Sequence, residues 1–364
     1  MTDPTDPAES RPRTEPVAGR APTIYDVARA AGVAPSTVSR AFARPGRINA
    51  DTAERIRRVA SALGYRANPS ARALPTGRTS MLALVVADVA NPFYSDIIRG
   101  VQVAATAAGY TMLLTDAEQS AAGEREVLDR AVSSADGVVL ATSGISGAAL
   151  RVIAGQRPVV VLNRAVPGVP CVVSDDPRGM RQAVAHLAGL GHRRITYLAG
   201  PQASWADGVR WDALVEAVRE RGLDACRSGP YPPTVDGGAA AAPELAGRPT
   251  TAVIAYNDLM AIGLIRALAA RGARLPEEVS VVGFDGILAA GLVTPALTTV
   301  AAPLRAMGRT AVGTLLDLVH GAPPAAGPPV RLPPELVVRA STARPGRSRP
   351  AWATASVPTS AGTG

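Results

Sequence analysis

Eight short runs of apolar, β-prone residues recur between residues 82 and 285, and alanine-rich helical segments lie between most of them. Runs that are apolar at nearly every position are typical of parallel strands covered on both faces. Strands that alternate with helices predict an α/β fold. We therefore expect two doubly wound parallel-sheet lobes, or one long sheet. The runs span residues 82–88, 110–116, 137–143, 159–164, 171–176, 195–200, 252–258 and 279–285.

Residues 22–67 show a different pattern, in which short helices are broken by turns. Thr23 begins the first helix as its cap, Asp26 follows three residues later, and Gly32 ends it. Two short helices joined by a turn that contains Gly are typical of a helix-turn-helix. We therefore expect an N-terminal all-α DNA-binding domain. Its helices are predicted over residues 23–31, 35–43 and 49–65, and its core is predicted to contain Val27, Val38, Ile56 and Leu63.

The basic charge of the chain is concentrated in and just after this domain. Residues 22–78 contain ten arginines against three acidic residues, a balance of +7 within a chain total of +8. A small basic domain attached to a nearly neutral remainder indicates a polyanion, such as DNA, as the partner of the small domain.

The helix predicted at 35–43 has the polar side chains that base reading requires. Arg40 is the best placed for a bidentate contact to guanine, and Ser36 is a second candidate for a base contact. Thr37 and Ser39 suit phosphate contacts, which position the helix without specifying sequence. The alternative is that these residues form only the solvated face of a small helix.

A short segment, NPSARAL at residues 68–74, follows the third helix directly. It is either a linker or a hinge that becomes ordered on DNA. In the second case Leu74 would enter the minor groove between base steps and kink the duplex.

Several of the predicted strands end in Asp or Asn. Ligands of open α/β sheets bind outside the carboxyl ends of the strands, so these side chains can converge on a cleft. The alternative is that each of them only caps the helix that follows. The residues are Asp88, Asp116, Asn163, Asp175, Asn257 and Asp285.

Seven stretches, in this order, resemble the LacI/GalR (lactose and galactose repressor) family. They are TIYDVARAAGVAPSTVSRAF, LGYRANPSARAL, NPFYSDIIRG, HLAGLGHRRITYLAGP, YNDLMAIG, SVVGFDG and PALTTV. The resemblance covers about residues 22–340. It implies a homodimeric repressor with a periplasmic-binding-protein-like core, which binds a small effector that controls affinity for a pseudopalindromic operator.

The resemblance also assigns DNA-binding residues. It makes Ser36 and Arg40 base readers, and it places Pro35 at another base-reading position, where proline offers no side-chain hydrogen bond. It makes Leu74 the minor-groove wedge, with Ala71 beside it. The predicted DNA-binding residues are Thr23, Pro35, Ser36, Thr37, Ser39, Arg40, Asn49, Ala71 and Leu74.

Six residues match positions that contact effector in the family. Phe93 matches an aromatic contact, and Tyr231 lies in a variable loop near the usual place of a ligand-stacking aromatic. Asp258 is assigned instead to the cap of the following helix. We expect a saccharide as the effector, with a nucleoside or another small polar metabolite as the alternative. The predicted effector residues are Phe93, Asn163, Arg210, Tyr231, Asn257 and Asp285.

The sequence also predicts the boundaries of the parts. Residues 1–21 are polar and Pro-rich without periodicity and are predicted to be disordered. Residues 341–364 are predicted to form a flexible tail. A hinge or linker is expected at 68–78, and the effector-binding and dimerisation core at 79–340. Its N-lobe is predicted at about 79–177 with 304–330, and its C-lobe at about 178–303 with 331–340.

Other classes of protein have little support in the sequence. We find no signal peptide and no apolar run near the ~20 residues of a membrane span, so we expect a cytoplasmic protein, nucleoid-associated when bound to DNA. We find no catalytic motif and expect neither a metal site nor a cofactor. The alternatives are a solute-binding protein with the same core and a sugar-processing enzyme. Whether the effector induces or corepresses stays open.

Overall fold

The computed structural model describes residues 20–43, 48–65, 78–117, 121–141, 144–248, 250–324 and 327–346. The chain divides into two units, Met1–Thr79 and Ser80–Gly364, which are described separately. The predicted disordered extension lies outside the described residues except for residues 20 and 21. Most of the predicted hinge, with Ala71 and Leu74, also lies outside them.

The described part of the first unit contains three helices. They are α1 (Ile24–Ala31), α2 (Pro35–Ala43) and α3 (Ala50–Ala62). Val27, Val38 and Ile56 are fully buried between them, as predicted. The prediction for Leu63 is wrong, because α3 ends before it and its side chain is 41% exposed. Gly32 has φ of 64°, a left-handed conformation that glycine adopts without strain and that turns the chain from α1 toward α2.

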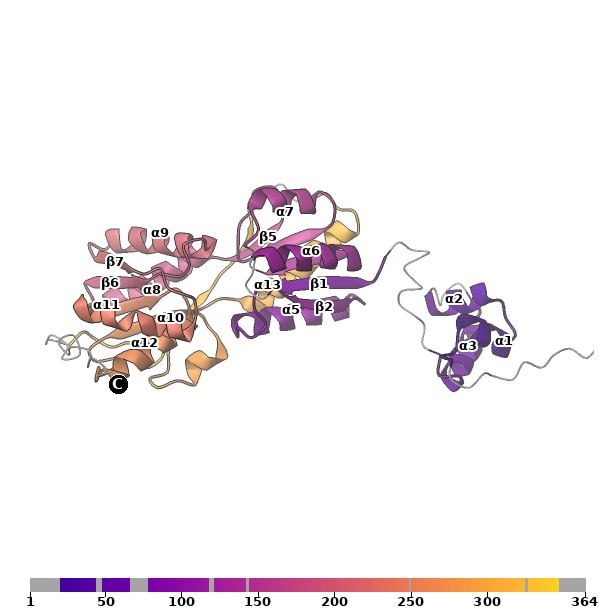
Figure 1. The fold of residues 1–364 in the computed structure, drawn as a ribbon, viewed down its shortest axis with the longest axis horizontal. Helices are drawn as coiled ribbons and strands as arrows, with labels where there is room; N and C mark the ends of the chain where they lie inside the picture. The colour runs from indigo at the N-terminus through magenta and orange to yellow at the C-terminus, as the bar shows by residue number, and fades with distance from the viewer. Residues whose placement is uncertain are drawn as a thin grey trace, which may run out of the picture. The chain divides into compact units, whose positions relative to one another are not determined.

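The second unit contains two six-stranded sheets, so the core has two lobes and not one long sheet. The strand order of the first sheet is β11-β5-β4-β3-β1-β2, and all its pairings are parallel. Figure 1 shows its helices in two layers, with α6 and α7 across the sheet from α5. Its strands are β1 (Met81–Val86), β2 (Thr111–Asp116), β3 (Gly137–Ala141), β4 (Val159–Leu162), β5 (Cys171–Ser174) and β11 (Val330–Leu332). Its helices are α5 (Phe93–Ala107), α6 (Ala121–Ser134), α7 (Gly147–Ala154) and α13 (Leu304–Val319).

Alternate side chains of β1 pack on opposite faces of this sheet. Leu82 and Leu84 pack in a cluster with α5 and α13, whereas Ala83 and Val85 pack in a cluster with α6 and α7. Because successive side chains of a strand point to opposite faces, a strand between two helix layers must be apolar at every position. This requirement explains the continuous apolar runs of the sequence.

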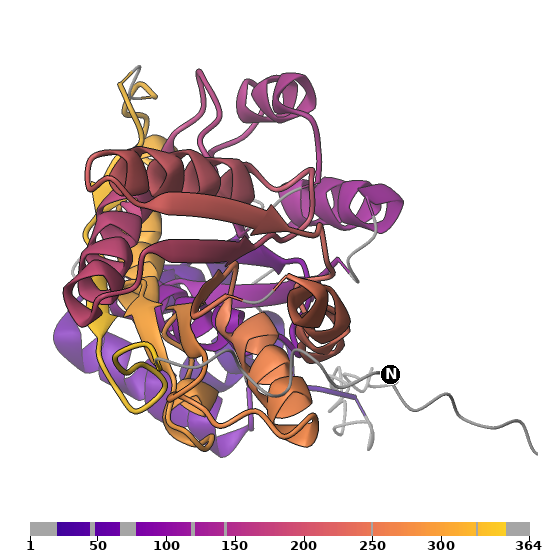
Figure 2. The ribbon, with the colours of Figure 1, turned by 90° about the vertical axis from the view of Figure 1, so that its left-hand side faces the viewer.

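The second sheet has the order β12-β10-β9-β8-β6-β7, and only β12 is antiparallel to its neighbour. Figure 2 shows it from the side of this lobe, with helices on both faces. Its strands are β6 (Arg194–Leu198), β7 (Asp224–Ser228), β8 (Ala252–Ala255), β9 (Ser280–Asp285), β10 (Thr298–Ala301) and β12 (Glu335–Val337). Its helices are α8 (Asp176–Leu190), α9 (Trp205–Arg219), α10 (Val235–Ala240), α11 (Ala242–Gly247), α12 (Asp258–Ala270) and the 3-10 helix η2 (Leu288–Gly291).

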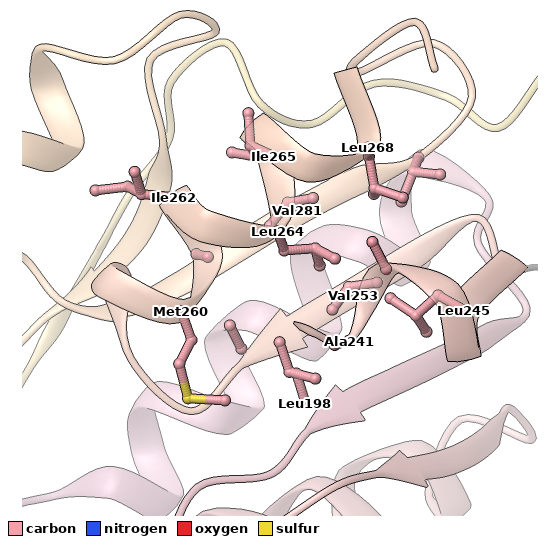
Figure 3. Close-up of a cluster of buried hydrophobic side chains, with 14 of the residues drawn as sticks. Leu198, Ala241, Leu245, Val253, Met260, Ile262, Leu264, Ile265, Leu268 and Val281 are labelled. Atoms are coloured by element: carbon pink, nitrogen blue, oxygen red, sulfur yellow. The ribbon is translucent and has the colours of Figure 1, made fainter. Parts of the chain in front are cut away.

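One part of the hydrophobic core of the second lobe lies between α12 and the sheet. Leu264 and Leu268 of α12 pack over Val253 and Val281, as Figure 3 shows. All eight predicted apolar runs form strands, but β7, β10, β11 and β12 were not predicted. These four strands have three to five residues each, and β7 is largely polar, so none of them carries a strong apolar run.

The predicted flexible tail begins too early, because residues 341–343 pack against the second sheet. Ser341 is 1% exposed, and its hydroxyl donates to the Val281 carbonyl (2.6 Å) and accepts from the Thr298 amide (2.8 Å). His192 Nε2 lies 3.0 Å from the Ala343 carbonyl oxygen. Polar residues of low sequence complexity are therefore ordered here by hydrogen bonds to the sheet, a contact that composition does not reveal.

We predict that truncation after Ala340 lowers the free energy of unfolding by more than about 2 kcal/mol, because buried partners of Ser341 and Ala343 lose their hydrogen bonds. Truncation after Gly346 keeps those bonds and is the matched control. Urea unfolding of both variants measures the difference. Equal midpoints for the two truncations would show that the segment contributes nothing.

Stability is also predicted to depend on pH through His192. Burial lowers the pKa of His192 below its usual value, so the unfolded chain binds a proton at this residue more readily than the folded chain. Its contribution to stability is therefore complete above about pH 6.5 and decreases as the pH falls from there toward the folded pKa. Urea midpoints of wild type and His192→Gln between pH 7.5 and 5 should converge at low pH, and parallel curves would refute this.

Candidate functional site

Helix α2 presents one polar face to solvent. Ser36, Ser39 and Arg40 are exposed and, at spacings of three and four residues, lie on the same face. Val38 and Ala41 are buried on the opposite face. The structure therefore places three of the side chains that were predicted to contact DNA on one exposed face, while Thr37 is half-buried.

The first turn of α2 is held by backbone alone. The Ala34 carbonyl accepts from the Thr37 and Val38 amides at 2.9 and 3.2 Å. Alanine has no side-chain acceptor, and Pro35 has no N–H to be satisfied. The first turn of α2 is thus held without a side-chain cap.

Thr23 and Asn49 stand at the starts of the other two helices. The Asp26 carboxylate accepts from both the amide and the hydroxyl of Thr23, at 2.8 and 2.6 Å. Asn49 Oδ1 accepts from the Asp51 amide at 2.9 Å. Each side chain is therefore engaged locally as a helix cap. Tyr25 of α1 was not among the predicted DNA-binding residues. Its ring is 65% exposed, and an aromatic residue on the polar side of a helix was the sequence signal for it.

The arginines of α1, α2 and α3 are exposed to solvent. Arg29, Arg55 and Arg57 are exposed, as is Arg40. Arg58 is also exposed and lies 3.7 Å from Glu54, a surface pair of small energetic weight. The positive charge expected from the sequence is thus on the surface.

The second unit has a cavity of about 540 Å³ between its two lobes, within the usual range for a small-molecule site. Much of its lining consists of residues at or just after the carboxyl ends of β1, β4, β8 and β9. This is the place where α/β sheets bind ligands. Tyr231 lies outside this lining, and its hydroxyl donates to Glu244 Oε2 at 2.5 Å. Five of the six predicted effector residues line the cavity, namely Phe93, Asn163, Arg210, Asn257 and Asp285.

Arg210 is buried in a set of fixed partners. Its Nε donates to Asp176 Oδ2 at 2.9 Å, and its Nη1 donates to the Tyr256 carbonyl oxygen at 2.5 Å. Its Nη2 lies 3.6 Å from Asp285 Oδ1, and its guanidinium carbon lies 3.7 Å from the centre of the Phe284 ring. Burial alone would lower the pKa of Arg210, but the two carboxylates raise it above its usual value, so the charge is held.

Two lining residues adopt strained backbone conformations. Asn163 has φ of 57° and Asp285 has φ of 110°. Residues other than glycine rarely adopt such conformations, and they persist at sites where the surroundings fix them. Burial also raises the pKa of Asp285 well above its usual value, although Arg210 opposes this.

The assignment of Asp258 as the cap of α12 is wrong. Asn257 is the cap of α12, because its Oδ1 accepts from the Met260 amide at 2.9 Å, while its Nδ2 donates to the Pro233 carbonyl oxygen at 3.1 Å. Asp258 is therefore not the cap. Its buried carboxylate accepts from the amides of Gly286 and Ile287 and from the Thr299 hydroxyl, so it fixes the turn after Asp285. Burial raises the pKa of Asp258 to about 6.

A second buried carboxylate, Asp207, organises another wall of the cavity. It accepts from the Gly200 amide at 2.7 Å and from the Tyr197 hydroxyl at 3.0 Å, and it pairs with Arg227. The loop that it closes contains Trp205, which lines the cavity.

Sequence reasoning missed Asp176, Trp205 and Tyr256 at or behind this cavity. Asp176 is one residue beyond the predicted cap Asp175, which accepts from the Arg178 amide. Trp205 carried a signal as one of only three tryptophans in the chain.

We predict that Asp258→Ala lowers the free energy of unfolding by at least about 2 kcal/mol, because two backbone amides and a hydroxyl lose their acceptor. Asp258→Asn keeps one acceptor oxygen and is the matched control, with a smaller expected loss. Chemical denaturation provides the measurement. A cost of only ~1 kcal/mol for Asp258→Ala would fit a simple helix cap and contradict the turn-fixing role.

Two family models match the chain. Residues 23–68 match bacterial regulatory proteins of the lacI family, and residues 184–342 match a periplasmic binding protein-like domain. These matches cover the helical unit and most of the second lobe.

Whole-length relatives agree with these matches. The HTH-type transcriptional regulator DegA of Bacillus subtilis is 35% identical over 332 residues, which cover 88% of this chain and 98% of DegA. The lac repressor dimer bound to operator and the anti-inducer ONPF superposes with a TM-score of 0.80 at 25% identity, covering 89% of this chain and all of that one. The CelR–cellobiose complex has a TM-score of 0.65 at 32% identity, covering 88% and 99%. The chain therefore belongs to the LacI family of bacterial regulatory proteins.

Proposed function

We propose that this protein is a transcriptional repressor that binds a specific operator through α2 and whose operator affinity is controlled by a sugar in the cleft between the two lobes. The observation that carries the proposal is the presence, in one chain, of a basic helical unit with an exposed reading face and of a cavity lined by both lobes. A lac repressor structure contains operator, and the CelR structure contains cellobiose.

On DNA, Arg40 and Ser36 contact base edges from the exposed face of α2, and Thr37 and Ser39 contact phosphates. Pro35 reduces the number of side chains on α2 that can hydrogen-bond to bases, because proline offers no side-chain hydrogen bond. Thr23 and Asn49 approach the backbone from the starts of their helices. Leu74, with Ala71 beside it, opens a minor-groove step in the hinge that follows.

The operator is pseudopalindromic, since a homodimer presents two equivalent reading helices. Leu288 and Leu292 are 81% and 75% exposed on the second lobe and offer apolar surface to a second copy. Both follow closely after Asp285 in the chain, so the cleft and this surface share one segment.

Other functions receive less support. A solute-binding protein has no use for the helical unit with its exposed arginines. An enzyme would need reactive groups, and we assign no catalytic residue, cofactor or metal to this chain. Among the described residues, no group of His, Cys, Asp or Glu is arranged to hold a metal ion, and no helix is long and apolar enough to cross a membrane. Operator binding places the protein in the cytoplasm, on the nucleoid.

The test uses purified full-length protein and operator selected from a random DNA pool. Arg40→Ala is expected to relax base preference at one position of each half-site, with a loss of about 1–3 kcal/mol for the preferred base. Arg55→Ala, which removes an exposed arginine of α3, is the matched control and should change affinity nearly equally for all sequences. An equal loss on every sequence for Arg40→Ala, or a selected site without two-fold symmetry, would refute the proposal.

A further inference from the structure

Trp205 gives the cavity a broad aromatic wall on the second lobe. It is the first residue of α9 and is half-buried at the cavity surface. Phe93 and Tyr94, at the start of α5, line the cavity from the first lobe, and their rings meet edge to face with centres 5.1 Å apart. Because Phe93 and Tyr94 are only 7% and 4% exposed, Trp205 is the main aromatic surface that a ligand between the lobes meets. A cyclic sugar suits such walls because one face of its ring exposes mainly C–H groups.

The backbone on both sides of Trp205 is fixed by hydrogen bonds. Ser204 caps α9, with its hydroxyl accepting from the Asp207 amide at 3.3 Å. Asp207 in turn holds the Gly200 amide at 2.7 Å, so the loop from Gly200 to Asp207 is closed by hydrogen bonds. An aromatic ring on a backbone held in this way gives contact area with little further loss of entropy on binding.

The two arginines that line the cavity already donate hydrogen bonds to protein groups. Arg210 is held by Asp176, the Tyr256 carbonyl and Asp285, and the Phe284 ring covers one face of its guanidinium group. Arg164, the second lining arginine, donates through Nη1 to the Ile145 carbonyl oxygen at 2.8 Å. Two carboxylates, those of Asp88 and Asp285, also line the cavity. A phosphate or carboxylate on a ligand would meet the Asp88 carboxylate, and it could pair with Arg210 only by displacing Asp176 or Asp285.

Uncharged polar groups supply the remaining contacts. The hydroxyls of Ser204 and Tyr256 lie 3.0 Å apart at the cavity wall, and Asn163 contributes an amide. Hydroxyl and amide groups both donate and accept, which is the requirement for binding sugar hydroxyls.

We propose that the cleft selects an uncharged cyclic sugar, that Trp205 determines specificity by stacking on its ring, and that phosphorylated and carboxylated forms of the same sugar are excluded. This inference rests on the proposed function, since it names the effector class of that same cleft.

The experiment measures sugar binding to the full-length protein by calorimetry and by tryptophan fluorescence. The probes are cellobiose, lactose, maltose and trehalose, each paired with its 6-phosphate, and glucose and galactose, each paired with its uronate. We expect at least one uncharged sugar to bind and its charged counterpart to bind at least tenfold more weakly. A charged member that binds as tightly as its uncharged counterpart would overturn the proposal, as would a panel in which no sugar binds.

Variants test the role of Trp205. Trp205→Ala should weaken binding of the uncharged sugar at least tenfold, and Trp205→Phe by a smaller factor, because a ring remains. Trp211→Phe alters a tryptophan of the same helix that packs on Tyr197, outside the cavity lining, and should bind as wild type does. Sugar binding should change the fluorescence of Trp211→Phe but not that of Trp205→Phe. Wild-type sugar affinity in Trp205→Ala would contradict the specificity role.

Operator binding by the same variants separates this proposal from the function on which it rests. If uncharged sugar binds through Trp205 but operator affinity never responds, the regulatory function fails and the ligand assignment stands. If only a charged sugar changes operator affinity, the regulatory function stands and the ligand assignment fails. Sugar-free Trp211→Phe should keep wild-type operator affinity, and circular dichroism shows whether Trp205→Ala is folded.

Discussion

The buried charge of Arg210 requires the arrangement of much of the second lobe. Removing an ion from water costs several kcal/mol, and the cost is offset only where partners are held in good geometry. Asp176 supplies one partner from the start of α8, Asp285 a second from the end of β9, and the Tyr256 carbonyl a third from the residue that follows β8. The ion cluster thus ties α8, β9 and the end of β8 to α9. Each of them contributes to the cleft or adjoins it.

The same cluster lies beside one of the three connections between the lobes, the one from β5 to α8. The chain leaves the first sheet at Ser174, the last residue of β5, and reaches Asp176 two residues later. A ligand that contacts Arg210 or Asp285 therefore acts on groups bonded to the crossover itself. The strained backbones of Asn163 and Asp285 lie on opposite lobes of this cleft and are fixed before any ligand arrives. The cleft is thus built before a ligand binds, and its ion cluster holds this crossover.

Sequence patterns predicted the central strands well, because strands buried between two helix layers must be apolar throughout. They did not predict β7 or β12, since edge strands are short and need no continuous apolar run. Polar residues at strand ends and family motifs predicted four of the cleft residues, namely Asn163, Arg210, Asn257 and Asp285. Asp258 was misassigned because a carboxylate that caps a helix and one that fixes a distant turn look alike in sequence. Trp205 was missed because its place depends on the Asp207 loop, whose hydrogen bonds join residues that no local pattern connects.

The central claim is that the cleft and the operator-binding unit are coupled, and one measurement tests it most directly. The operator dissociation constant of the full-length protein is measured without ligand and with saturating amounts of the uncharged sugar that binds the cleft. A coupling of the usual size, ~1–3 kcal/mol, predicts a change of about 5- to 150-fold, and operator must change the sugar dissociation constant by the same factor. An operator affinity that stays constant while the cleft is fully occupied would contradict the account.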